Sequence, residues 1–191
     1  MARLPLRTIE NAPEAAKAAL ETAEKNSGFL SNLLRLLANS PLALETYQTV
    51  GAINARASLT LAERETVQIT AAATHGCAFC VAGHTSIARK KTDLDEATVS
   101  GLREREKLEN ARLDAVARFT EAVIANRGAV TDAELAAFKA AGFDDQAALE
   151  VVLGVSLATL CNFANNLGQV PLNEQLENCR WTPPSVREAA E

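Results

Sequence analysis

The chain has 191 residues, of which 48% are hydrophobic, and a formal net charge of −5. This apolar fraction is too high for a disordered protein, and the length suits one domain. The acidic balance argues against nucleic-acid binding, and the low share of aromatics, 4%, argues against a β-sandwich or β-barrel.

Start and stop signals predict a series of helices in the first part of the chain. One helix follows Pro13 and ends before Gly28, and a short helix begins at Ser31. Ser40 and Pro41 form a strong start signal, with Ser as the N-cap and Pro as the first helical residue. The apolar residues of this third helix lie close to one face and predict its buried side: Leu42, Leu44, Tyr47, Val50 and Ile53.

A capping box at residues 60–63 predicts a helix that begins at Leu61 and runs to Ala73. Thr74-His75-Gly76 interrupts this helix, and a further helix is expected over residues 77–89. Because Gly76 breaks the chain there, Cys77 is expected in the first turn of the new helix.

Helical patterns continue to about residue 142. Residues 93–96 open one helix, and a second capping box at residues 131–134 opens another. Residues 107–127 form an amphipathic segment that Gly128 closes. The expected core face of that segment is Leu113, Val116, Phe119, Val123 and Ile124.

The most apolar stretch lies in a long helix expected from Asp144 or Asp145 to about Asn166. Its centre, residues 151–161, is too short to span a bilayer, so a buried helix is expected rather than a membrane partner. The N-terminus lacks the apolar run of a signal peptide, so we expect a cytoplasmic protein. No segment predicts a strand, and the expected fold is an all-α bundle.

Glu65, Cys77, Cys80 and His84 carry the chemistry that the sequence suggests. The cysteines are three residues apart and His84 follows four residues later, so all three share a helix face. The preceding break lets the two helices pack side by side, which would bring Glu65 to His84. A helix N-terminus and a neighbouring histidine favour the thiolate, which is the nucleophilic form of cysteine. A carboxylate that orients a histidine serving a cysteine is typical of an activated nucleophile.

This constellation resembles the Glu-x11-Cys-x2-Cys-x3-His motif of the AhpD-like alkylhydroperoxidases, within the carboxymuconolactone decarboxylase superfamily. The four residues match it without a gap, and the lead-in over residues 59–65 is similar too. The resemblance is strongest over about residues 28–90. It implies an all-helical AhpD-like domain over residues 1–180, with a family core at about 40–125 and an irregular tail at 181–191. It also implies a homo-oligomer, commonly a trimer or a hexamer.

The resemblance further implies a thiol peroxidase that works without haem, flavin or another cofactor. It assigns Cys80 as the thiolate that attacks the peroxide, Cys77 as the resolving thiol, and Glu65 with His84 as the proton relay. An external thiol reductant, similar to dihydrolipoamide or thioredoxin, would then reduce the disulfide. One departure is Phe79, which stands where the founding alkylhydroperoxidases have a histidine.

Two other functions stay open at this point. Lactone decarboxylation, the other chemistry of the superfamily, needs no cysteine pair. A non-enzymatic redox sensor or zinc-binding module would use Cys77, Cys80 and His84 as three zinc ligands, with Glu65 or His75 as a fourth.

The end of the long helix holds a weak echo of the cysteine motif. Residues 161–164 are similar to residues 77–80, which a duplicated helical unit would explain and chance similarity would explain equally well. Cys161 is expected in the core, and Cys179 is expected to be a bystander. The amides of this helix end need partners, across a subunit interface or as caps: Asn162, Asn165 and Asn166.

Overall fold

The computed structural model describes residues 2–184, which form nine α-helices and one 3-10 helix and contain no strand. The all-α prediction is therefore confirmed. In chain order the elements are α1 (Glu14–Ser27), α2 (Asn32–Leu37), α3 (Pro41–Asn54), α4 (Leu61–Thr74), α5 (Ala78–Lys91), α6 (Glu96–Glu104), α7 (Ala111–Ala125), α8 (Asp132–Ala140), α9 (Asp145–Gly168) and the 3-10 helix η1 (Glu174–Cys179).

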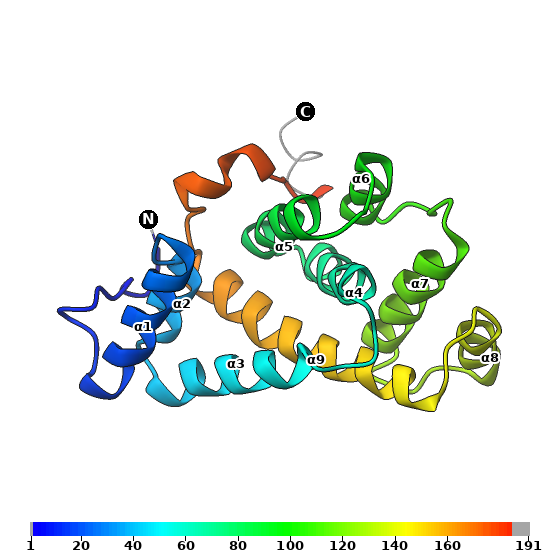
Figure 1. The fold of residues 1–191 in the computed structure, drawn as a ribbon, viewed down its shortest axis with the longest axis horizontal. Coiled ribbons are helices and arrows are strands. Elements are labelled where there is room, and N and C mark those ends of the chain that lie inside the picture. The colour runs from blue at the N-terminus through cyan, green and yellow to red at the C-terminus, as the bar shows by residue number, and fades with distance from the viewer. Residues whose placement is uncertain (1, 185–191) are drawn as a thin grey trace.

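Helix α4 lies in the middle of the molecule and packs against α5, α6, α7 and α9 (Figure 1). Its start is fixed by the predicted capping box, in which the Thr60 hydroxyl accepts from the Glu63 amide and the Glu63 carboxylate accepts from the Thr60 amide. Every residue from 65 to 73 is buried, so α4 is enclosed on all sides. A run of alanines at its end allows neighbouring helices to approach closely.

The turn between α4 and α5 is a Schellman motif. The Cys77 amide donates to the Ala72 carbonyl at 2.9 Å, and the Gly76 amide donates to the Ala73 carbonyl at 3.2 Å. Gly76 has a φ of +64°, a left-handed conformation that favours glycine. The turn sends α5 back along α4, as the break in the sequence predicted.

Helix α9 crosses the bundle and contacts α2, α3, α4, α5 and α7. Gly154 permits its close approach to α4, because a Cβ atom there would lie 2.9 Å from Cγ1 of Val67. Gln68 on α4 fixes the same crossing by donating to the Gly154 carbonyl at 2.9 Å. The buried face of α9 continues towards the start of α5.

The apolar centre considered in the sequence, residues 151–161, is part of the longer helix α9. Among the residues that the structure describes, α9 is long and apolar enough to cross a membrane by length and composition: it has 24 residues, and its most apolar 18-residue window has a mean hydropathy of 1.7. About 33% of its most apolar window is buried inside the protein. The cytoplasmic location stays a prediction.

Three local expectations need correction. On α3, Leu44 is buried as expected, but Leu42 and Ile53 are 74% and 42% exposed. Helix α7 begins only at Ala111, because the Asn110 side chain caps it, and Ile124 is only half-buried. Cys77 is the N-cap of α5 rather than a residue of its first turn.

The C-terminal segment returns to the bundle through η1, which packs against α5. Trp181 is buried in the same hydrophobic core as Cys77 and Cys80, and its indole N–H donates to Glu104 at 3.2 Å. This part of the expected tail therefore docks on its own chain. Residues 185–191 of the expected tail lie outside the described residues, and the domain boundary at residue 180 stays a prediction.

Candidate active site

The structure brings Glu65 and His84 into direct contact. Nδ1 of His84 donates to Oε2 of Glu65 at 2.8 Å, from α5 to α4 across the Schellman turn. Glu65 is buried, whereas part of the His84 ring is exposed. Burial lowers the pKa of His84, but the Glu65 carboxylate and negative charge on Cys80 raise this pKa more, so the net shift is upward. The pair therefore favours an imidazolium beside the dithiol.

The two cysteines of the motif lie at the start of α5. Cys77 is the N-cap residue, and its Sγ accepts from the backbone amide of Cys80 at 3.4 Å. Cys80 lies in the first helical turn, where unpaired amides carry partial positive charge. Its side chain packs in the core with only 4% of the residue exposed.

The two thiols differ in acidity. A hydrogen bond from Cys77 lowers the pKa of Cys80 most, and burial opposes this effect. The charge of His84 and the amides of Asn162 and Asn165 lower the same pKa further, so that its net value is about 7. The same hydrogen bond and burial raise the pKa of Cys77 far above its usual range. Of the two thiols, Cys80 is therefore the one that ionises more readily near neutral pH, while Cys77 stays protonated.

Helix α9 supplies two site residues that the sequence did not assign. Nδ2 of Asn165 donates to Sγ of Cys80 at 3.2 Å, and the nearby Asn162 amide also helps to lower the pKa of Cys80. Both asparagines are buried. The signal available in the sequence was two amides, three residues apart, in an otherwise apolar helix. Within the chain, Asn165 contacts Cys80 and Asn162 contacts His75, and neither of these contacts caps α9.

His75 contacts three side chains at the end of α9. It is the C-cap residue of α4, and its Nδ1–H donates to Oδ1 of Asn162 at 3.0 Å. Its backbone carbonyl accepts from Nδ2 of Asn166 at 2.9 Å, and its ring meets Phe163 edge-on with centroids 5.0 Å apart. The pKa of Cys80 is thus influenced both by His84, which Glu65 holds, and by Asn162, which His75 holds.

Three further residues of the dithiol region are apolar or neutral. Phe79, which stands where the founding alkylhydroperoxidases have a histidine, is buried in the same core cluster. Burial raises the pKa of Cys161, and negative charge on Cys80 raises this pKa further. Burial also raises the pKa of Tyr47, as does negative charge on Cys161, Cys80 and Glu65. Tyr47, expected only as a core residue, is therefore a neutral phenol close to the reacting groups.

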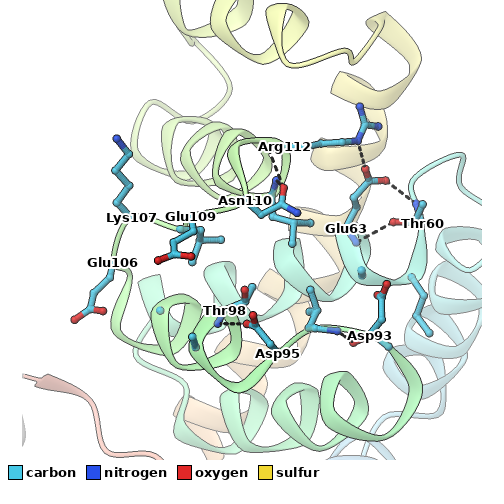
Figure 2. A pocket seen from close by; sticks show the side chains of 18 of the residues that line it. Thr60, Glu63, Asp93, Asp95, Thr98, Glu106, Lys107, Glu109, Asn110 and Arg112 are labelled. Carbon is cyan, nitrogen blue, oxygen red and sulfur yellow. Dashed lines mark hydrogen bonds and ion pairs between the residues drawn. The ribbon is translucent and has the colours of Figure 1, made fainter.

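A cavity of about 1150 Å³ lies away from the thiols (Figure 2). It is lined by the first turns of α4, α6 and α7, and Figure 2 shows Glu63 between Thr60 and Arg112 at its edge. Nε of Arg112 donates to Oε1 of Glu63 at 2.6 Å, which ties α7 to α4. None of the four predicted site residues lines this cavity.

Cys179 lies apart from the dithiol. It is buried, and its sulfur accepts from Nη1 of Arg89 at 3.5 Å. Over residues 2–184, no group of three or more His, Cys, Asp and Glu side chains is arranged to hold a metal ion.

Comparison with known proteins finds a family match over part of the chain. The model of the carboxymuconolactone decarboxylase family matches residues 41–132, a segment that contains Glu65, Cys77, Cys80 and His84. No curated protein matches the chain significantly.

Solved structures share the whole fold. An uncharacterized peroxidase-related protein from Ralstonia eutropha JMP134, described as an alkylhydroperoxidase AhpD core, is 21% identical with a TM-score of 0.79, over 92% of this chain and 94% of that one. A peroxidase-related protein from Silicibacter sp. TM1040 is 16% identical with a TM-score of 0.76, over 91% and 92%. The debrominase Bmp8 is 16% identical with a TM-score of 0.73, over 92% and 94%, and its cysteine-to-alanine variant has been solved with 2,3,4-tribromopyrrole. Residues 41–132 therefore match the carboxymuconolactone decarboxylase family, and the chain has the AhpD-like fold.

Proposed function

We propose that this protein is a thiol-dependent peroxidase that reduces hydrogen peroxide or organic hydroperoxides through a Cys77–Cys80 disulfide. The observation that carries the proposal is the Cys80 thiol, whose pKa is lowered to about 7 beside a protonated partner thiol. A thiolate with a neighbouring thiol can be oxidised and resolved within one helical turn.

The first step of the proposed cycle uses Cys80 and His84. The Cys80 thiolate attacks the terminal oxygen of the hydroperoxide, an S–O bond forms, and the O–O bond breaks. His84, protonated and held by Glu65, gives its proton to the departing alkoxide or hydroxide. The products are Cys80 sulfenic acid and an alcohol or water.

The second step closes the disulfide. The Cys77 sulfur attacks the sulfenic sulfur, its proton passes to the leaving hydroxide, and water departs. The N-cap position of Cys77 suits this role, because its Sγ already contacts the Cys80 amide. An external dithiol of the dihydrolipoamide or thioredoxin class then reduces the disulfide to two thiols.

Thiol-dependent debromination is a second candidate, favoured by the apolar Phe79 next to Cys80 and by the shared fold with Bmp8. Two thiols supply the two electrons that replace a C–Br bond by C–H, with bromide and the disulfide as the other products. Lactone decarboxylation would use neither cysteine.

The test of the proposed function is peroxide-dependent disulfide formation. Reduced protein treated with hydrogen peroxide is expected to lose two hydrogens in the peptide that contains Cys77 and Cys80, as measured by mass spectrometry. A panel of dihydrolipoamide, thioredoxin and small thiols then identifies the class of donor. If peroxides leave the peptide reduced while tribromopyrrole oxidises it, the debromination candidate replaces the peroxidase.

We also expect a homo-oligomer, a trimer or a hexamer, as the resemblance implies. Large apolar side chains lie exposed on two adjacent helices, and exposed apolar surface of this kind marks association sites. They are Leu42 and Ile53 on α3 and Leu149, Val152, Phe163 and Leu167 on α9. Light scattering after size-exclusion chromatography is expected to give three or six chains, and Leu149→Glu with Leu167→Glu to give a smaller mass. A monomeric wild-type protein at micromolar concentration would contradict this prediction.

A further inference from the structure

Two buried amides of α9, Asn162 and Asn165, lower the pKa of Cys80, and the partners of their side-chain oxygens differ. Oδ1 of Asn162 accepts a hydrogen bond from His75 at 3.0 Å. Oδ1 of Asn165 is buried and has no hydrogen-bond partner among the residues that the structure describes, although the residue is only 3% exposed. An unpaired buried carbonyl is rare in folded proteins and destabilises the folded state, so it needs an explanation.

The position of Oδ1 of Asn165 explains why this oxygen has no partner. Nδ2 of the same amide lies 3.2 Å from Sγ of Cys80, so Oδ1 belongs to the immediate surroundings of the reacting sulfur. An atom transferred to that sulfur therefore arrives next to a carbonyl oxygen that is ready to accept a hydrogen bond. The partner that fits must carry a donor hydrogen on the atom that Cys80 attacks.

We propose that Oδ1 of Asn165 is the acceptor for the O–H group of a hydroperoxide, and that it selects hydroperoxides over electrophiles without such a hydrogen. This inference rests on the proposed peroxidase function and names its substrate class. During the attack, the terminal oxygen moves from its O–O bond to an S–O bond and keeps its hydrogen. Oδ1 therefore holds the same O–H group in the hydroperoxide and in the Cys80 sulfenic acid, while the proton for the leaving alkoxide comes from His84.

Asn162 provides the matched control. Asn162→Leu and Asn165→Leu each remove an amide that lowers the pKa of Cys80, and both are expected to raise the thiol pKa. Only Asn165→Leu also removes the unpaired acceptor. The thiol pKa of each variant is measured from the pH dependence of alkylation, so that rates can be compared per thiolate.

The experiment measures the reaction of each reduced protein with hydrogen peroxide and with 2,2′-dithiodipyridine, a disulfide with no hydrogen on the attacked atom. Per thiolate, Asn162→Leu is expected to leave the peroxide-to-disulfide rate ratio unchanged. Asn165→Leu is expected to lower this ratio about tenfold. An equal ratio in the two variants would overturn the inference.

A second substitution covers the case in which Asn165→Leu does not fold. Asn165→Asp keeps an oxygen acceptor, removes the donor and adds negative charge, so the thiol pKa is expected to rise while the ratio per thiolate stays near the wild-type value. A ratio that falls about tenfold in Asn165→Asp would contradict the acceptor role. A wild-type protein that reacts with the disulfide but with no hydroperoxide would instead refute the peroxidase function itself.

Discussion

Cys80→Ser is expected to lower the rate of peroxide reduction by a factor on the order of 10³ or more, because it removes the nucleophile. The pKa of Cys80 is lowered to about 7, so a large share of this thiol is thiolate near neutral pH. A serine hydroxyl in the same position stays protonated and does not attack the peroxide oxygen. The measurement is consumption of hydrogen peroxide in the presence of dihydrolipoamide.

Two companion variants separate the roles of the cysteines. Cys77→Ser is expected to consume one equivalent of peroxide and then stop, because the Cys80 sulfenic acid has lost its resolving thiol. Cys179→Ser is expected to keep wild-type turnover, because Cys179 contacts Arg89 rather than the dithiol. Substantial peroxide turnover in Cys80→Ser, with Cys77 intact, would show that Cys80 is not the nucleophile.

The second large effect concerns the pH profile of the thiolate. In the wild-type protein the alkylation rate of Cys80 is expected to rise tenfold per pH unit below about 7 and to level off above it, since only the thiolate reacts. His84→Ala removes a positive charge that lowers the pKa of Cys80, so the midpoint is expected to move to higher pH by about one unit. At pH 6 the rate then falls about tenfold.

Glu65→Gln is expected to move the profile in the same direction by a different route. The Glu65 carboxylate helps to raise the pKa of His84, so its loss lowers this pKa and leaves less imidazolium beside Cys80 at neutral pH. Glu63→Gln is the matched control, because this buried carboxylate of the same helix pairs with Arg112 instead. Identical profiles for the wild type, Glu65→Gln and His84→Ala would remove the relay from the mechanism.

The contact between Glu65 and His84 could be predicted because it depends on local signals. A capping box fixes where α4 begins, Gly76 fixes where the chain turns, and the register of two adjacent helices follows from these points. The approach of Asn162 and Asn165 to Cys80 depends instead on how α9 crosses the bundle, some 85 residues later in the chain. No pattern within one helix carries that information.

The wrong predictions for α3 and α7 also arise because packing between elements cannot be read from one helix. Apolar spacing assigned Leu42 and Ile53 to the buried face of α3, but spacing does not state whether a neighbour covers every part of that face. The amphipathic pattern from residue 107 onward includes the buried Leu108, which packs in the core although it precedes the helix. The cap at Asn110 was the signal that marks the true start of α7.

The enclosure of α4 determines where this fold can change its substrate. Because residues 65–73 are all buried, most substitutions on this helix alter packing before they alter the reaction. Helix α9 has one face on the dithiol and another that is largely exposed, so packing fixes fewer of its residues than on α4. Divergence of substrate preference among proteins of this architecture is therefore expected to concentrate on the last long helix, with the carboxylate-bearing central helix kept as a fixed support.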